Sequence, residues 1–322
     1  MRYVMEKAKI NRYNTLMRRV FIIVSSVWAT LIFRSMNARN LLWSNAVISA
    51  AAAACVLGSL ALGGTGLSGP AQWAFALGVG SATWWAYTWQ RHVKSTRPDG
   101  LRPDHLAWHR HHWPRIRLVA LLLLPLASVP LLMTAGNLMA TPSALLSTPT
   151  ALLATCAAIT VLYAGLPGER GIRQSLRRIP GIKMLWISGA WATITALWPL
   201  WWALGMESGL PEGAVLLWGE RFLVISALTL PFDLRDRRWD PDGMRTWPQL
   251  LGPAGTRILG LAFLVAAGLL RWALQPALEW NALLGPAAMA IAVLAAREDR
   301  PLSYYGLLDA LLIADAAFLL LV

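Results

Sequence analysis

The sequence is short of charged residues. Only 14% of its 322 residues are Asp, Glu, Lys or Arg, whereas 57% are hydrophobic. A soluble domain of this size needs more charged side chains to cover its surface. The composition therefore excludes an ordinary soluble globular protein and indicates a protein surrounded by lipid.

Cysteine is also scarce. The chain has 2 cysteines, Cys55 and Cys156, and both fall in apolar runs, where a free thiol behaves as a small apolar side chain. This excludes a disulfide framework, and neither cysteine suggests a metal site. Low-complexity segments and a separate soluble domain are missing as well, which leaves a single membrane domain as the simplest organisation.

Long apolar runs are what the sequence has in quantity. Each is about 20 residues long, the length that a helix needs to cross the hydrocarbon layer of a membrane. Backbone groups in lipid must bond within their own segment, and the runs do not alternate as barrel strands do. We therefore predict an all-α integral membrane protein with nine transmembrane helices, at roughly 41–62, 71–90, 116–135, 149–166, 183–204, 213–232, 256–274, 277–296 and 302–322.

Acidic residues are fewer than basic ones, and the basic ones are unevenly distributed. The chain has 16 Asp and Glu against 29 Lys and Arg, a formal net charge of +13. If the chain crosses nine times, all basic residues except Arg221 and Arg271 fall in segments on one side of the membrane. This positive-inside pattern predicts a cytoplasmic N-terminus and an extracytoplasmic C-terminus. It also accounts for the charge without a nucleic-acid partner.

One further apolar run, Val20 to Phe33, is too short to span comfortably. Arg34 follows it directly. If this run crossed the membrane, Arg34 would lie outside and every later loop would be inverted. We therefore predict a cytoplasmic segment over residues 1–40 with an interfacial helix, followed by one transmembrane domain over residues 41–322.

Three of the scarce carboxylates lie in the stretch LPFDLRDRRWDPDGMRTWPQLLG, at residues 230–252. On a helix Asp233, Asp236 and Asp240 share one face, and the neighbouring arginines point elsewhere. Such carboxylates repel one another unless a cation lies between them, and Mg²⁺ bridges carboxylates to phosphate. Arg245 could bind the same phosphate. The alternative is an exposed loop in which the aspartates pair with nearby arginines.

The pattern DxxDxxxD, followed by DGMRTWPQLLG, resembles the second aspartate-rich motif of the UbiA superfamily of intramembrane prenyltransferases. That family has nine transmembrane helices, with this motif in the cytosolic loop after the sixth. The resemblance implies that Asp233, Asp236 and Asp240 bind Mg²⁺ and that Arg245 binds a prenyl diphosphate, which ionises to an allylic cation. It also implies a hydrophobic acceptor and a bacterial inner membrane.

The first motif of that family, NDxxDxxxD, should follow the second span, where this chain reads YTWQRHVKSTRPDG. In the alignment its three aspartates become Gln90, Val93 and Arg97, and none of these is a carboxylate. The basic residues here could contact phosphate directly, which makes Gln90, Arg91 and Lys94 candidate substrate-binding residues. They are equally typical of the cytoplasmic end of a helix.

This departure from the family leaves two functions open. The first is a prenyltransferase or isoprenoid cyclase that acts on a prenyl diphosphate at the cytoplasmic side of the bundle. The second is a non-catalytic UbiA-like protein that binds a lipid or a partner protein. The intact second motif favours the enzyme, whereas the missing acids of the first motif favour the non-catalytic protein.

Ionisable residues also fall inside the predicted spans. Glu220 and Arg221 lie in the sixth span, and Asp309 and Asp315 lie in the ninth. Charged groups are costly at that depth and usually face a cavity or one another. One interpretation makes Arg221 and Asp309 substrate-binding residues in the wall of a chamber. The other is a structural ion pair between the sixth and ninth spans.

All five histidines lie between residues 92 and 112. His105 and His109 are four residues apart, a spacing that could bind zinc on a helix, although no third ligand is obvious. Trp108 and Trp113 lie beside them, as in an interfacial loop. The segment therefore predicts either a metal site or a loop at the membrane surface.

Overall fold

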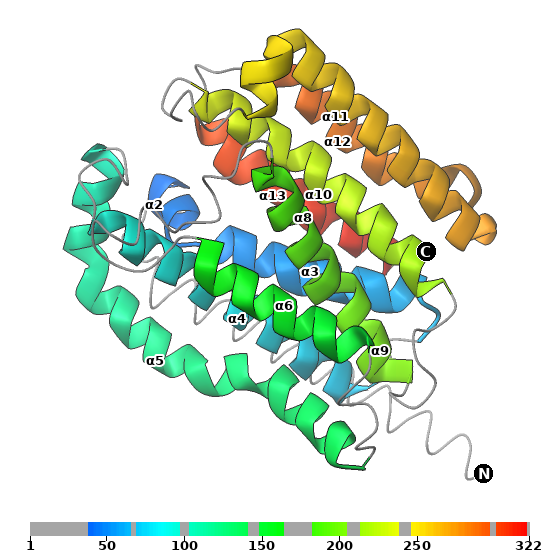
Figure 1. Ribbon diagram of the computed structural model, residues 1–322, viewed down its shortest axis with the longest axis horizontal. Helices are drawn as coiled ribbons and strands as arrows, with labels where there is room; N and C mark the ends of the chain where they lie inside the picture. The colour runs from blue at the N-terminus through cyan, green and yellow to red at the C-terminus, as the bar shows by residue number, and fades with distance from the viewer. Residues whose placement is uncertain are drawn as a thin grey trace.

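The computed structural model describes residues 38–65, 69–96, 103–140, 148–163, 182–204, 213–237, 246–296 and 301–320. Over these residues it is helical and contains no β-strand. The helices lie side by side in a bundle (Figure 1). The predicted all-α class is thus confirmed for the described part of the chain. The predicted interfacial helix lies outside the described residues.

The helices follow the order of the apolar runs. They are α2 (Ala38–Trp43), α3 (Ala46–Leu62), α4 (Pro70–Ser95), α5 (Pro103–Ala140), α6 (Thr148–Tyr163), α8 (Lys183–Ala192), η3 (Thr193–Leu197), α9 (Trp198–Leu204), α10 (Ala214–Asp236), α11 (Trp247–Leu274), η5 (Pro276–Leu283), α12 (Leu284–Ala295) and α13 (Pro301–Leu319). η3 is a π-helical turn and η5 is a 3₁₀ helix. Each apolar run overlaps one helix or a continuous series of helices.

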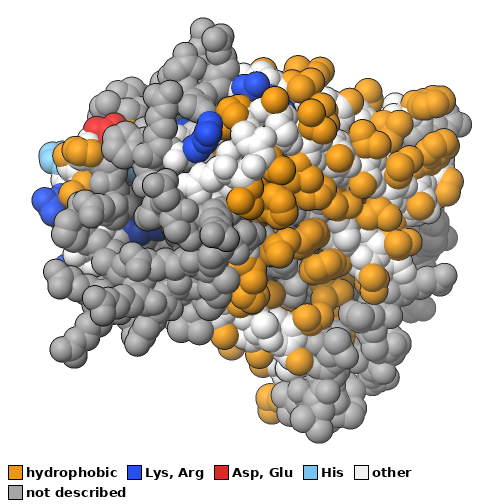
Figure 2. Space-filling model, turned by 45° about the horizontal axis from the view of Figure 1, so that its top comes forward, with side chains coloured by type: hydrophobic (Ala, Val, Ile, Leu, Met, Phe, Trp, Pro, Cys, Tyr) orange, Lys and Arg blue, Asp and Glu red, His pale blue; other side chains and the backbone are white. Residues whose placement is uncertain are grey.

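Among the described residues, three helices are long and apolar enough to cross a membrane: residues 103–137 of α5, and all of α10 and α11. The surface agrees with this, since leucine side chains on α5 are more than half exposed, among them Leu121 and Leu122. Figure 2 shows apolar side chains over a broad part of the visible surface, with most of the visible charged and histidine side chains toward one end. The chain is therefore suited to a membrane, as its composition predicts.

Short-range signals explain where two of these helices begin. Pro70 opens α4, and Pro248 lies in the first turn of α11, where the missing N–H of proline has no cost. The backbone N–H of Thr246 donates to the side chain of Gln249, with N and O 2.9 Å apart, which caps the start of α11. The local sequence thus sets these helix starts before any tertiary contact is made.

The core of the bundle lies around α3 and α10. α10 packs against α8, η3, α11, α12 and α13, and α3 packs against α4, η3, α9 and α13. Buried apolar side chains fill the space between them, including Ala51, Val224, Leu228, Leu264, Met289 and Leu312. Because α8 lies along α10, the start of α8 meets the acidic end of α10.

Candidate functional site

The end of α10 carries the two aspartates of the predicted metal face that the structure describes. Asp233 and Asp236 lie one turn apart, and α10 ends at Asp236. Asp233 is buried, with 1% of its surface exposed, whereas Asp236 is half-buried. Asp240 and Arg245, the other two members of the predicted site, lie outside the described residues.

Asp233 is paired with Lys183, the first residue of α8. Lys183 Nζ lies 2.5 Å from Asp233 Oδ1, and Lys183 is also buried, with 7% exposed. Removing either partner would leave the other charged in apolar surroundings, which is costly. In the sequence Lys183 counts only as one more cytoplasmic basic residue. Its position at the start of an apolar helix is the signal that could have identified it.

Asp236 is paired with its own neighbour, Arg235. Nε and Nη2 of Arg235 lie 2.6 and 2.7 Å from the two carboxylate oxygens, a bidentate arrangement. The guanidinium also lies 5.5 Å from the centre of the Phe232 ring, within the range of a cation–π contact. The prediction that Arg235 points away from the acidic face is therefore wrong, because its long side chain folds back onto Asp236.

These two ion pairs bear directly on the predicted Mg²⁺ site. Within the described ranges, no three His, Cys, Asp or Glu side chains lie close enough together to hold a metal ion. Asp233 and Asp236 as arranged do not fit a divalent cation, because Lys183 lies against Oδ1 of Asp233 and Arg235 binds both oxygens of Asp236, and these cations would repel it. Since Asp240 is not described, the three-aspartate set stays a prediction.

The candidate residues of the degenerate first motif lie in the last two turns of α4. Arg91 Nη1 donates a hydrogen bond to the backbone carbonyl of Trp43, which joins α4 to α2. Arg91 also interacts electrostatically with Asp309 of α13. Gln90 and Lys94 are half-buried beside it on the same helix. Arg91 thus joins α4 to α2, and its charge acts on Asp309 of α13, an interaction that the sequence did not indicate.

Aromatic side chains lie further along the same helices, inside the bundle. Trp191 Nε1 of α8 donates a hydrogen bond to Tyr87 Oη of α4 over 3.3 Å. Tyr87 and Phe232 both pack against the buried apolar cluster that includes Trp191. Aromatic faces attract cations, so these residues could line a site for a carbocation. Helix packing alone also explains their contacts.

The histidines stack on tryptophans where α4 and α5 meet. His92 stacks on Trp113 with ring centroids 4.2 Å apart, and His105 stacks on Trp43 at 4.8 Å. The interpretation of this segment as a loop is wrong, because α5 begins at Pro103 and includes it. Burial lowers the pKa of His92 below its ordinary value of 6.5, because the cation would lose hydration.

The zinc interpretation gains no support from this arrangement. His105 and His109 are one turn apart, yet no group of three metal-ligating side chains exists in the described part of the chain. His109 instead borders a small cavity of about 10 Å³ with Asn45 and Arg91. Asn45 Oδ1 and His109 Nε2 are buried there without a hydrogen-bond partner. A space of this size holds about one water molecule.

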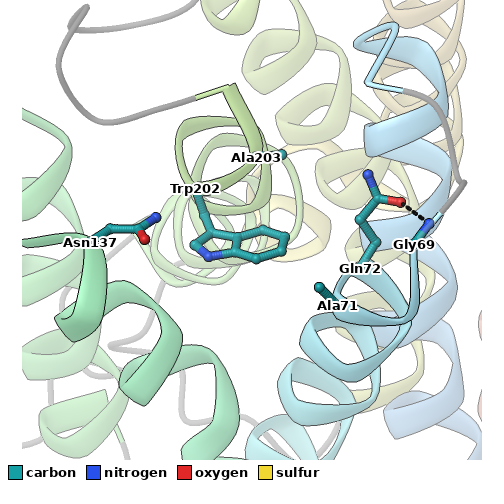
Figure 3. A pocket seen from close by; sticks show the side chains of 6 residues that line it. All are labelled: Gly69, Ala71, Gln72, Asn137, Trp202 and Ala203. Atoms are coloured by element: carbon teal, nitrogen blue, oxygen red, sulfur yellow. Dashed lines mark hydrogen bonds between the residues drawn. The ribbon is translucent and has the colours of Figure 1, made fainter.

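A larger cavity, of about 260 Å³, lies at the opposite end of the bundle. It is bordered by the start of α4 and the ends of α5 and α9 (Figure 3). Its lining is uncharged and consists of Gly69, Ala71, Gln72, Asn137, Trp202 and Ala203. Because α4 begins here and carries Arg91 near its other end, this cavity is separate from the carboxylates of α10.

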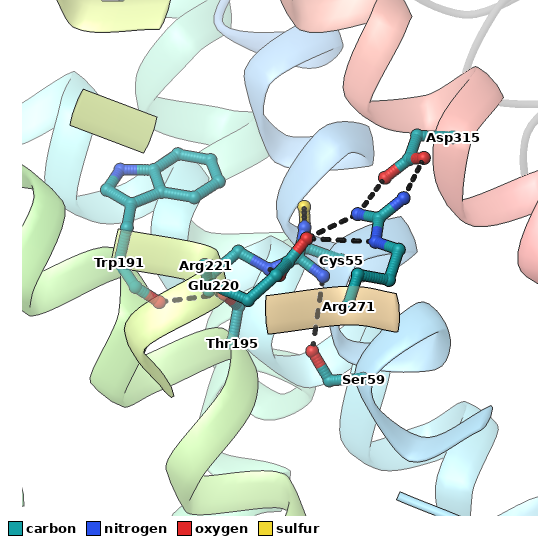
Figure 4. Close-up of polar contacts among 8 residues, drawn as sticks. All are labelled: Cys55, Ser59, Trp191, Thr195, Glu220, Arg221, Arg271 and Asp315. Atoms are coloured by element: carbon teal, nitrogen blue, oxygen red, sulfur yellow. Dashed lines mark hydrogen bonds and ion pairs between the residues drawn. The ribbon is translucent and has the colours of Figure 1, made fainter. Parts of the chain in front are cut away.

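A second charged cluster lies inside the bundle (Figure 4). Arg271 of α11 donates two hydrogen bonds to Asp315 of α13, at 2.6 and 2.9 Å. Its Nε donates to Glu220 of α10 at 3.0 Å, and its Nη2 makes a further contact with the same oxygen. None of the three is more than 4% exposed. The ion pair between the sixth and ninth spans therefore runs through Arg271, which the sequence had left unpaired.

Arg221 contacts two neutral groups, and its Nε lies 3.9 Å from Oε2 of its neighbour Glu220. Its guanidinium donates to Cys55 Sγ at 3.3 Å and to Ser59 Oγ at 3.4 Å, both on α3. It is 1% exposed and lines neither of the two cavities. The assignment of Arg221 to substrate binding therefore stays a prediction, and its described contacts are those of a structural residue.

Comparison of the chain with models of known protein families, with curated proteins and with solved structures gives no match. The resemblance to the UbiA superfamily thus depends on the motif at residues 230–252 and on the order of the apolar runs.

Proposed function

We propose that the protein is a UbiA-like intramembrane prenyltransferase or isoprenoid cyclase. It acts on a prenyl diphosphate at the cytoplasmic end of a nine-helix bundle in a bacterial inner membrane, with its N-terminus in the cytoplasm and its C-terminus outside. The observation that supports this most is the register of Asp233 and Asp236 at the end of α10, next to the buried Lys183. The nine apolar runs, each overlapping described helices, support the architecture.

The side chains at this end suit an anionic head group next to the apolar core of the bundle. Lys183, Arg91 and Lys94 are cations that can neutralise phosphate oxygens, and the motif predicts Arg245 as a further one. The surrounding bundle excludes water from an allylic cation, and Tyr87, Trp191 and Phe232 offer aromatic faces to it. If a hydrophobic acceptor captures the allylic cation, the reaction is a transfer. If a double bond of the same isoprenoid captures it, the reaction is a cyclisation.

Mg²⁺ is the cofactor that the resemblance implies for this chemistry. When bound, such an ion supplies positive charge to the leaving diphosphate. Asp233 and Asp236 do not fit it in their present pairs, so we assign no step to the ion. Asp240 is the remaining predicted ligand.

A non-catalytic lipid-binding or partner-binding protein is the second candidate. One observation favours it: both described aspartates of the second motif are occupied by protein cations. The loss of all three acids from the first motif points the same way. A former active site of this kind would still offer a membrane cavity for a lipid or a partner protein.

Pyrophosphate release from proteoliposomes tests the proposal. The full chain would be supplied with prenyl diphosphates of several lengths and a bacterial lipid extract as the source of acceptor. We expect release above that of protein-free liposomes, reduced in Asp236→Ala and unchanged in Asp104→Asn, which removes an exposed carboxylate from the first turn of α5. Binding without release would support the second candidate, and neither binding nor release would contradict the enzyme.

A further inference from the structure

The ammonium group of Lys183 occupies the place on Asp233 where a UbiA-like enzyme would hold its metal. The two groups are 2.5 Å apart, and both residues are buried, with exposures of 7% and 1%. A divalent ion on the same carboxylate would sit next to an ammonium group and be repelled by it. Displacing Lys183 would leave a buried cation without its partner, which is costly.

Asp236 is no better placed to receive a metal. Both of its carboxylate oxygens accept hydrogen bonds from Arg235, at 2.6 and 2.7 Å. A metal would have to compete with a bidentate guanidinium contact, which is among the stronger hydrogen-bonded pairs in proteins. The two described aspartates of the motif thus hold two protein cations.

The end of α4, where the first motif of the family would lie, also carries cations instead of free carboxylates. The alignment places the acids of the first motif at the end of α4, where this chain has Gln90 together with Arg91 and Lys94. Arg91 donates a hydrogen bond to the backbone carbonyl of Trp43, and its charge acts on Asp309 of α13. The described charged residues near these positions include the cations Arg91, Lys94, Lys183, Arg235 and Arg237 and the carboxylates Asp233, Asp236 and Asp309.

We propose that this chain binds a lipid-linked diphosphate without a divalent metal, and that Lys183 is the cation that contacts it. The inference rests on the proposed function, because it concerns the same head group. Asp233 is a positioning residue: it holds the ammonium at the start of α8 and does not itself bind the ligand. Ammonium and guanidinium groups neutralise phosphate oxygens directly, so the protein supplies the charge that a metal supplies elsewhere.

The test is a binding measurement on the purified full chain in detergent, with farnesyl diphosphate as the probe. The dissociation constant is compared in EDTA and in excess Mg²⁺. We expect the two values to agree within about twofold. Lys183→Gln should weaken binding by about tenfold or more, the loss expected for one charge-assisted hydrogen bond, and Lys183→Arg should restore most of the affinity.

Asp233→Asn distinguishes a positioning residue from a metal ligand. We expect this variant to bind farnesyl diphosphate to the same extent in EDTA and in Mg²⁺, because Lys183 remains. If Asp233 were a metal ligand, the Mg²⁺-dependent binding of the parent would be lost in the variant. Size-exclusion elution and thermal unfolding of each variant separate a binding defect from a folding defect.

The outcomes separate the inference from the proposed function. Binding that requires Mg²⁺ and disappears in Asp233→Asn overturns metal independence but leaves the proposed function in place. Absence of binding by the folded parent in either condition overturns both. Inorganic pyrophosphate and farnesyl phosphate, tested in parallel, show whether the free anion is the ligand. Pyrophosphate binding as tight as that of farnesyl diphosphate would contradict a lipid-linked ligand.

Discussion

The bundle holds two clusters of ion pairs, and the two clusters are built in different ways. Around Arg271, two carboxylates from two other helices, Glu220 and Asp315, surround one guanidinium deep among apolar side chains. At the end of α10, Asp233 meets Lys183 from α8, and Asp236 meets the adjacent Arg235 at a more exposed position. One cluster is enclosed, and the other lies at the end of the bundle.

The environment of the two clusters explains the difference. Gly285 of α12 faces the inner cluster, and a Cβ atom there would lie 1.7 Å from Asp315 Oδ1. The inner cluster thus has no room for a ligand on that side and acts as a cross-link between α10, α11 and α13. Residues 238–245, which follow the outer cluster in the sequence, contain the rest of the second motif. A binding site is therefore expected at the outer cluster.

The largest effect should come from the inner cluster. Arg271→Met would leave Asp315 buried without its guanidinium and Glu220 with only the weaker pair to Arg221, and we expect a loss of about 3–5 kcal/mol in the free energy of unfolding. The double variant Arg271→Met, Asp315→Asn removes one charge of each sign and leaves Glu220 with Arg221, so it should recover much of that loss. Thermal unfolding of the detergent-solubilised protein measures both. An Arg271→Met variant as stable as the parent would contradict a structural role.

In the outer cluster, replacing Asp233 should reduce the free energy of unfolding more than replacing Asp236. Asp233→Asn leaves the buried Lys183 without its counter-charge and should cost about 1.5–3 kcal/mol. Asp236→Asn breaks a half-exposed pair and should cost about 0–1 kcal/mol. The same unfolding assay compares them. Equal costs would show that the pair at Asp233 is as solvated as the pair at Asp236.

Gly285→Ala tests whether the inner cluster is closely packed. The added methyl group would displace Asp315 or Arg271, and we expect a loss of about 1–3 kcal/mol. Gly189→Ala is the matched control, because a Cβ atom on that α8 glycine meets no other atom within 4 Å. Alanine is also the better helix former, so the control should be neutral or more stable. Similar destabilisation of both variants would locate the effect elsewhere than in the cluster.

The smallest effect should be a pH dependence at the junction of α4 and α5. The pKa of His92 in the folded protein lies below its ordinary value of 6.5, so the unfolded chain binds this proton first. Neutral His92 therefore contributes fully to stability above pH 6.5. This contribution is lost as the pH falls through the lower pKa that His92 has in the folded state. His92→Gln should flatten the decline of the unfolding temperature between neutral and acidic pH. An unchanged slope would assign the dependence to other groups.

Much of the fold was predictable because it depends on local chemistry. Apolar runs of about 20 residues predicted the helices, and Pro70 and Pro248 lie at helix starts. The error at residues 103–113 came from reading histidine and arginine as signs of a loop. A helix forms there because the rings stack on tryptophans, including Trp43 of α2 and Trp113 of α5.

The candidate site was predictable only in part. The spacing of Asp233 and Asp236 on one helix was visible, since helical periodicity depends on residues three and four apart. Their partners were not equally visible. Lys183 is fifty positions away from Asp233, and Arg235 was placed on the wrong face because side-chain length can override the direction of the Cα–Cβ bond.

By itself, the sequence determined that this chain is helical and suited to lipid, because both properties follow from composition and from the spacing of nearby residues. Only the tertiary structure decided which charges meet. Arg271 rather than Arg221 binds Asp315, and Asp309 lies near Arg91. Such pairs join helices far apart in the chain, and in an apolar interior the cost of an unpaired charge selects the packing that satisfies all of them together.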